Sequence, residues 1–119
     1  MKNKILIIDD EKDVVLMLVY RLKAAQFEVI TAVTGQEGIN AAQVHQPNLI
    51  LLDSRLPDMR TKDAMQALQK IKGLEKVPLV LIAACLDEAD QKVQQCQAVD
   101  FLCKPVDPDI LIKKVREII

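Results

Sequence analysis

Three carboxylates follow two apolar runs, and these carboxylates are the side chains best placed for chemistry. Asp9 and Asp10 come directly after Ile5-Leu6-Ile7-Ile8, and Asp53 comes directly after Leu49-Ile50-Leu51-Leu52. Short, continuous apolar runs of this kind predict strands that are buried on both faces of a parallel sheet. Parallel strands end at the same edge of a sheet, so neighbouring strands would bring the three carboxylates together. The sequence therefore predicts an acidic cluster at one sheet edge.

Such a cluster needs a compensating cation. At about 4 Å and an effective dielectric constant of about 20, two like charges repel each other by roughly 4 kcal/mol. The alternative is that acidic residues merely solvate the ends of strands. Because two strands of this composition both end in acid, we expect a metal-dependent acidic site.

Strand-like and helix-like segments alternate along the 119 residues. The predicted strands are Lys4–Ile8, Glu28–Ala32, Asn48–Leu52, Val77–Ala83 and Phe101–Cys103. The predicted helices are Glu11–Ala25, Gln36–His45, Lys62–Lys72, Glu88–Cys96 and Pro108–Ile119. Because parallel crossover connections are right-handed, this alternation predicts one α/β domain with a doubly wound parallel sheet and helices on both faces. In such folds ligands bind beyond the carboxyl ends of the strands.

Composition and charge exclude several classes of protein. The chain has 16 basic and 17 acidic residues and a formal net charge of −1, which argues against direct nucleic-acid or membrane binding through bulk charge. No apolar run approaches the length of a membrane span. The cysteines Cys85, Cys96 and Cys103 form no C-x-x-C pair and no metal-binding spacing. We therefore expect reduced, buried thiols in a cytoplasmic protein.

Three motifs occur in order along the chain. They are Asp9-Asp10, the segment Leu52-Asp53-Ser54-Arg55-Leu56-Pro57-Asp58-Met59, and Lys104-Pro105 after the fifth predicted strand. With these motifs the chain resembles, over residues 1–119, the receiver domain of response regulators in two-component signalling, including the chemotaxis regulators. The resemblance implies a flavodoxin-like sheet of five strands in the order 2-1-3-4-5 with five helices. It also implies a signalling domain that at most assists its own Mg²⁺-dependent phosphorylation and dephosphorylation.

The resemblance also implies roles for individual residues. Asp53 would accept a phosphoryl group from a histidine kinase or a phosphotransfer protein, and we expect it to be ionised at neutral pH. Asp10 and Asp53 would bind Mg²⁺ (or Mn²⁺) directly, because these ions prefer oxygen ligands. Asp9 would act through a water molecule and Arg55 through its backbone carbonyl. Lys104 would hold a cation beside the phosphoryl oxygens.

The chain departs from the receiver pattern at the switch positions. The family carries Thr or Ser at the end of the fourth strand, where this chain has Ala83, and residues 78–90 contain neither Ser nor Thr. In the family that hydroxyl binds the phosphoryl group and couples phosphorylation to a surface rearrangement. A hydrogen bond to a charged group is worth about 1.5–3 kcal/mol. The second switch residue, usually aromatic, is kept as Phe101, while Thr61 and Gln97 replace two glycines usual in the family.

Two functions therefore stay open. The first is a receiver that is phosphorylated on Asp53 and relays the signal to a downstream effector protein or output domain. The second is a pseudo-receiver that acts as a phosphorylation-independent docking module. A nucleotide- or flavin-binding domain is disfavoured because the first strand–helix turn is Asp-Asp-Glu and lacks the glycines of a phosphate loop. A metal-dependent phosphohydrolase would need substrate-binding machinery that this length barely permits.

Surface apolar residues suggest where partners bind. On a helical wheel Leu16, Met17 and Tyr20 fall outside the stripe that should face the sheet. Because their helix borders the acidic site, we expect a docking face for a phosphodonor helix, against the alternative of apolar residues scattered on a surface. The last helix could add a homodimer or effector surface, although a core face is the simpler assignment. The sequence fits both a stand-alone regulator and the N-terminal part of a longer one.

Overall fold

The computed structural model of the chain describes residues 2–84 and 100–119. Its strands are β1 (Lys4–Ile8), β2 (Glu28–Ala32), β3 (Leu49–Asp53), β4 (Leu79–Ala84) and β5 (Asp100–Lys104). Its helices are α1 (Lys12–Ala24), α2 (Gly35–His45), α3 (Thr61–Gln69) and α5 (Pro108–Ile118). These bounds agree with the predicted segments to within three residues at each end. The helix predicted at Glu88–Cys96 lies outside the described residues.

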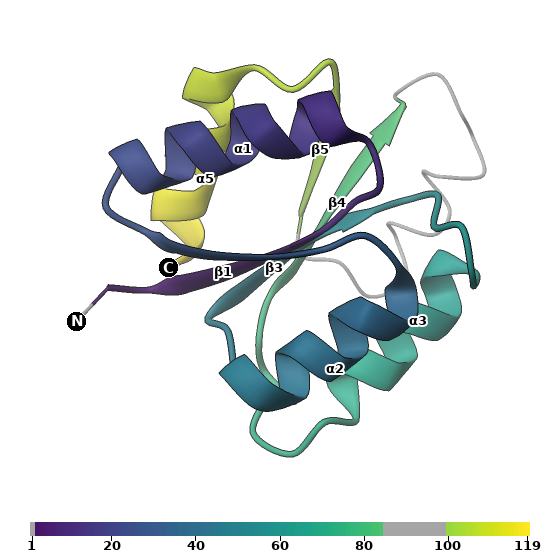
Figure 1. Cartoon of the computed structure of the whole chain (residues 1–119). Coiled ribbons are helices and arrows are strands. Elements are labelled where there is room, and N and C mark those ends of the chain that lie inside the picture. The colour runs from purple at the N-terminus through teal and green to yellow at the C-terminus, as the bar shows by residue number, and fades with distance from the viewer. Residues whose placement is uncertain (1, 85–99) are drawn as a thin grey trace.

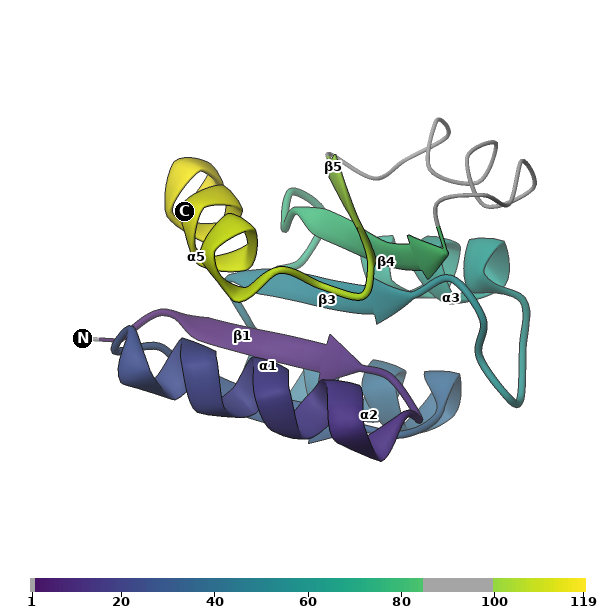
Figure 2. The same cartoon turned by 90° about the horizontal axis from the view of Figure 1, so that it is seen from above.

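The five strands form one parallel sheet in the order β2-β1-β3-β4-β5, which confirms the predicted flavodoxin-like topology. Helices α1 and α5 cover one face of the sheet, and α2 and α3 cover the other (Figure 1; Figure 2). The chain runs from β1 outward to β2 and then returns to β3 on the other side of β1. The order therefore reverses between β1 and β3, and such a reversal opens a crevice at the carboxyl ends of the two strands.

Both central strands are buried on both faces, which explains their continuous apolar runs. In β1, Ile5 and Ile7 pack in the cluster that contains α1 and α5, whereas Leu6 and Ile8 pack in the cluster that contains α2 and α3. Side chains alternate across a strand, so a slip of one residue would move every one of them to the wrong face. Burying one such side chain is worth roughly 1.5–3 kcal/mol, which fixes the register and with it the residues that follow each strand.

Helix α2 is held close to the sheet edge by its own sequence. The Thr34 hydroxyl accepts a hydrogen bond from the Glu37 amide (3.0 Å), and the Glu37 carboxylate accepts one from the Val33 amide (3.0 Å). These two reciprocal bonds satisfy amides at the start of the helix. A Cβ at Gly38 would lie 2.3 Å from Cδ1 of Ile8, so any larger residue here would force the buried Ile8 side chain or the helix to shift.

The expectation of reduced, buried thiols is wrong for Cys103. Its side chain is exposed and disulfide-bonded. The physical reason is alternation along the edge strand β5: Leu102 packs into the core, so Cys103 points to the opposite face. Cys85 and Cys96 lie outside the described residues. Among the helices of the described ranges, none combines the length and the apolar character needed to cross a bilayer.

Candidate functional site

The structure brings together the three carboxylates that the sequence singles out. Ile8 of β1 pairs with Leu52 of β3, so the residues that follow them lie side by side at the carboxyl edge of the sheet. Asp9, Asp10 and Asp53 each offer a carboxylate oxygen, and these oxygens lie within 4.8 Å of one another. Asp9 and Asp53 are buried, whereas Asp10 is exposed. The cluster therefore has a buried floor and an open side.

Lys104 supplies a cation at this cluster from the end of β5. Its Nζ lies 3.3 Å from Oδ2 of Asp53, 3.6 Å from Oδ2 of Asp9 and 2.5 Å from Oε1 of Glu11. The peptide bond between Lys104 and Pro105 is cis. Burial lowers the pKa of Lys104, but the hydrogen bond that the ammonium donates to Glu11 and the charges of the nearby carboxylates outweigh it and raise that pKa above its usual value. The lysine is therefore a permanent cation at neutral pH.

Backbone amides hold one oxygen of each buried carboxylate. The Glu11 amide donates to Oδ1 of Asp9 (2.9 Å), and the Arg55 amide donates to Oδ1 of Asp53 (3.2 Å). Each aspartate thus bonds the backbone two residues further on, a local turn that orients the carboxylate. Oδ2 of Asp9 is buried and accepts no hydrogen bond from the part of the chain that the structure describes.

The ammonium of Lys104, 3.6 Å from that oxygen, is too distant to donate a hydrogen bond to it, so the oxygen can accept a further positive partner. A buried acceptor without a partner costs about 1–3 kcal/mol, and more when it is charged. Beside it opens a cleft of about 360 Å³, lined by Asp10, Glu11, Asp53, Ser54, Arg55 and Lys104. A hard divalent cation in this cleft would meet carboxylate and carbonyl oxygens, the ligands that Mg²⁺ and Mn²⁺ prefer. The residues present therefore fit such an ion.

The acidity of Asp53 differs from the sequence-based expectation. Burial and the neighbouring charge of Asp9 raise its pKa to about 7, although the Arg55 amide and Lys104 oppose the shift. Without a bound cation, burial and the charge of Asp9 therefore oppose the full ionisation of Asp53 that the sequence led us to expect at neutral pH. A divalent cation would favour the charged form. Sequence alone does not reveal how deeply this carboxylate is buried, and burial is the larger cause.

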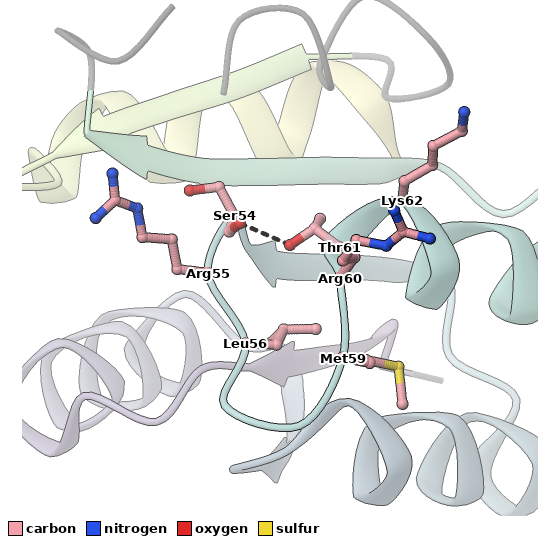
Figure 3. Close-up of a pocket in the computed structure, with 7 residues that line it drawn as sticks. All are labelled: Ser54, Arg55, Leu56, Met59, Arg60, Thr61 and Lys62. Atoms are coloured by element: carbon pink, nitrogen blue, oxygen red, sulfur yellow. Dashed lines mark hydrogen bonds between the residues drawn. The ribbon is translucent and has the colours of Figure 1, made fainter. Parts of the chain in front are cut away.

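The loop between β3 and α3 is pinned at two points. The buried hydroxyl of Thr61 contacts the carbonyl oxygens of Ser54 (2.7 Å) and Asp53 (3.2 Å), and Figure 3 shows it directed at Ser54 from the start of α3. The carboxylate of Asp58 accepts hydrogen bonds from the amides of Gly35 (2.8 Å) and Gln36 (3.0 Å) at the start of α2. Both hydrogen bonds lower the pKa of Asp58, and the bond from the Gln36 amide has the larger effect.

The same close-up shows how the loop presents its cationic side chains. Arg55 extends on one side of the loop, whereas Arg60 and Lys62 extend on the other (Figure 3). Arg60 pairs with Asp63 one turn along α3 (3.2 Å). The three cations therefore do not converge on one ligand, although they line the same hollow.

Sequence reasoning missed Thr61 and Asp58 as structural supports of the site, and it missed Glu11 altogether. A signal for Glu11 was present, because it extends the acidic pair to Asp-Asp-Glu. No sequence signal shows that the Thr61 hydroxyl points inward.

The proposed switch residues lie on the two strands beside β3. Ala83 is buried in β4, directly after Ile82, which pairs with Asp53. It lies across from Cys103 of β5, on the strand that separates the strand of Asp53 from the strand of Lys104. Phe101 is half-buried against the cluster that contains α2 and α3.

The surface of α1 only partly matches the expected docking face. Leu16 and Tyr20 are 69% and 74% exposed. Met17 does not belong with them, because it packs against the core between α1, α5 and the sheet. The reason is that α1 contacts α5 as well as the sheet, which widens its buried face. Val33 follows β2 and is 52% exposed, and it replaces Met17 as the apolar neighbour of Leu16. The two residues line an apolar groove of about 210 Å³ that reaches Asp9 and Asp10.

Comparisons with known proteins match this geometry. The family model of the response regulator receiver domain matches residues 5–116. The chain is 31% identical over 121 residues to the alkaline phosphatase synthesis transcriptional regulatory protein PhoP of Bacillus subtilis, covering 100% of the chain and 49% of PhoP. It thus spans about half the length of such curated relatives.

Solved structures share the fold. The chemotaxis response regulator CheY4 of Vibrio cholerae superimposes with a TM-score of 0.92 at 23% identity, over 100% of both chains. The receiver domain of the sensor histidine kinase PA1611 from Pseudomonas aeruginosa superimposes with a TM-score of 0.90 at 20% identity, covering 98% of this chain and 97% of that one. That structure has a magnesium ion coordinated in its active site cleft.

Proposed function

The chain belongs to the response regulator receiver domain family, and from this premise we propose that Asp53 accepts a phosphoryl group with the help of a bound Mg²⁺ (or Mn²⁺) ion. The observation that carries the proposal is the cluster at the carboxyl edge of β1 and β3. There the buried carboxylate of Asp53 lies beside the buried carboxylate of Asp9 and 3.3 Å from the ammonium of Lys104.

In this proposal the cation is held by residues around the cleft. Asp10 and Asp53 would bind it directly, the Arg55 carbonyl would complete the protein ligands, and Asp9 would act through a water molecule. The buried Oδ2 of Asp9, which accepts no hydrogen bond from the described residues, supports this assignment, and so does the magnesium ion in the PA1611 receiver domain of the same fold. A bound Mg²⁺ would neutralise charge on the phosphoryl oxygens during transfer.

The chain's own residues would position the reacting groups. A carboxylate oxygen of Asp53 would form a bond to phosphorus as the bond between phosphorus and the donor's leaving atom breaks. The Arg55 amide orients the Asp53 carboxylate through its hydrogen bond to Oδ1. The Lys104 ammonium, on the Oδ2 side, would bind a phosphoryl oxygen and stabilise the charge that it carries. The domain would thus assist its own modification.

A histidine kinase or a phosphotransfer protein would be the donor, and its helix would dock on α1 beside the site. Leu16 and Tyr20 are exposed there, and the groove at Leu16 reaches the acidic cluster. We expect the double change Leu16→Glu with Tyr20→Lys to slow transfer from a protein donor while labelling by acetyl phosphate stays unchanged. Equal transfer from the protein donor would remove this surface from the proposal. Signal output would pass to an effector protein or an output domain.

A second function, the phosphorylation-independent docking module, is favoured by one observation. Ala83 offers only a methyl group at the end of β4, where a hydroxyl would contact the phosphoryl group. If the chain is such a module, phosphorylation of Asp53 will leave the affinity for its effector unchanged. A phosphorylation-dependent change in that affinity would exclude this function.

Acetyl phosphate with Mg²⁺ tests the main proposal, with intact-protein mass spectrometry as the readout. We expect the mass to rise by one phosphoryl group, and we expect Asp53→Asn or removal of Mg²⁺ to abolish the gain. Asp63→Asn, a change of an exposed carboxylate on α3, is the matched control and should label like the wild type. No labelling of the wild type, or labelling that persists in Asp53→Asn, would contradict the proposal.

A further inference from the structure

We propose that Glu11 competes with the phosphoryl group for the ammonium of Lys104, so that phosphorylation exchanges one ion pair for another and frees Glu11 at the start of α1. The inference rests on the proposed phosphorylation of Asp53. It assigns a regulatory role to a carboxylate outside the acceptor and the expected metal ligands.

Lys104 lies closer to Glu11 than to either buried carboxylate. Its Nζ lies 2.5 Å from Oε1 of Glu11, closer than the 3.3 Å and 3.6 Å that separate it from Asp53 and Asp9. The Glu11 side chain is 56% exposed, whereas the Asp9 side chain is fully buried. The ammonium is therefore drawn toward the solvent side of the cluster, although two buried carboxylates lie within its reach.

A phosphoryl group on Asp53 would bind the Lys104 ammonium more strongly than Glu11 does. A phosphoryl group carries a charge of about −1.5 to −2 and offers three acceptor oxygens, against the single charge of Glu11. Charge-assisted hydrogen bonds also strengthen where water is excluded, and the acceptor position at Asp53 is buried. The Glu11 carboxylate is more than half exposed, so water weakens its attraction to the ammonium. The phosphoryl group should therefore take the ammonium, and its charge should repel Glu11.

Glu11 lies at the start of α1, where a change in its contacts can affect the helix surface. It is the N-cap residue of α1, yet its side chain makes no capping hydrogen bond to the helix. Once free of Lys104, its carboxylate would lie at the positive end of the helix dipole. Lys12, the next residue, lines the groove that also contains Leu16. The exchange would thus carry the modification state to the face of α1 without a hydroxyl at Ala83.

The competition predicts that removing the charge of Glu11 favours the modified state. We compare Glu11→Gln with Asp13→Asn, which removes the same charge from an exposed residue in the first turn of α1. Acetyl phosphate is titrated with Mg²⁺ present, and the labelled fraction is read by intact mass. Glu11→Gln should reach half-labelling at an acetyl phosphate concentration about two- to fivefold lower than the wild type. Asp13→Asn should match the wild type.

A second measurement follows the release of Glu11 directly. In ¹H–¹⁵N spectra, labelling of the wild type should shift the amides of Glu11 and Lys12, and this shift should shrink in Glu11→Gln. If the wild type labels but Glu11→Gln labels equally or less well, or if Asp13→Asn gains as much, the competition is overturned while the proposed function stands. If neither the wild type nor Glu11→Gln labels, both proposals are overturned. Labelling of Glu11→Gln alone would support the competition.

Discussion

The ammonium of Lys104 lies 3.3 Å from Oδ2 of Asp53 although β4 separates their two strands in the sheet. The lysine thus reaches across a strand end to balance carboxylates that the core holds buried. Lys104→Met should therefore destabilise the metal-free protein, by about 1–3 kcal/mol in urea unfolding, because Asp9 and Asp53 lose their cation.

Lys114→Met is the matched control for that change. Lys114 pairs with Asp100 at 2.9 Å, but both side chains are more exposed than those of Lys104, Asp9 and Asp53. Loss of such a surface pair should cost less than about 1 kcal/mol. Millimolar Mg²⁺ should restore stability to Lys104→Met and have less effect on Lys114→Met. Equal losses in the two variants would show that Lys104 does not balance the buried charges.

The raised pKa of Asp53 makes the metal-free protein less stable as the pH rises. A carboxyl whose pKa goes from 3.8 to about 7 on folding binds its proton more tightly in the folded state. Its contribution to stability is full below the unfolded pKa and is lost as the pH rises through the folded one. Between about pH 4 and pH 7 the wild type should lose on the order of 1–3 kcal/mol more than Asp53→Asn.

Magnesium should reverse this dependence, because binding needs the deprotonated carboxylate. Thermal unfolding with and without Mg²⁺ across the same pH range gives both the stability of the metal-free protein and the stabilisation by Mg²⁺. The stabilisation by Mg²⁺ should grow as the pH rises toward neutrality in the wild type and should be small at every pH in Asp53→Asn. A pH profile that is identical in the two proteins would mean that Asp53 is not the titrating group.

Much of the site could be predicted because it depends on strand ends. The runs before Asp9 and Asp53 are buried on both faces, so their patterns are continuous, and the pairing of Ile8 with Leu52 then places the carboxylates together. The alternation of strands and helices indicated parallel strands, since each return needs a helical crossover. Sheet order itself came from a family resemblance.

The features that the sequence did not predict depend on how single side chains pack against residues distant in the chain. The helical wheel of α1 could not show that Met17 packs beside α5, because a helical wheel carries no information on neighbouring helices. The pKa of Asp53 depends on burial by several elements, and Cys103 is exposed because it lies on an edge strand. The inward hydroxyl of Thr61 likewise depends on where the loop carbonyls point.

Thr61 gives a prediction about the loop that carries the acceptor. Its buried hydroxyl bonds the Ser54 carbonyl at 2.7 Å, directly before Arg55. Thr61→Val keeps the shape but removes the hydroxyl, and it should cost about 1–2 kcal/mol in urea unfolding because the half-buried Ser54 carbonyl loses its donor. Thr61→Ser keeps the bond and should cost less.

The same pair of variants also tests the proposed metal site. Because the Arg55 carbonyl is a proposed ligand, Thr61→Val should weaken Mg²⁺ binding, measured by NMR titration, about threefold or more, and Thr61→Ser should not. If both variants bind Mg²⁺ like the wild type while Thr61→Val is destabilised, the hydroxyl supports the fold and not the ion.

Asp58 joins the same loop to α2 through hydrogen bonds from the Gly35 and Gln36 amides. These bonds stabilise the fold only in the pH range in which the Asp58 carboxylate is charged. The amides of Gln36 and Gly35 lower the pKa of Asp58 below 3.8, so its contribution is present above that pH and is lost as the pH falls through the lowered value. Asp58→Asn should therefore lower the melting temperature at neutral pH, and the difference from the wild type should vanish in strong acid. Asp63→Asn, on the exposed surface of α3, should show a smaller difference at neutral pH. A deficit of Asp58→Asn that persists unchanged in acid would mean that the amide side chain packs badly and that the charge contributes nothing.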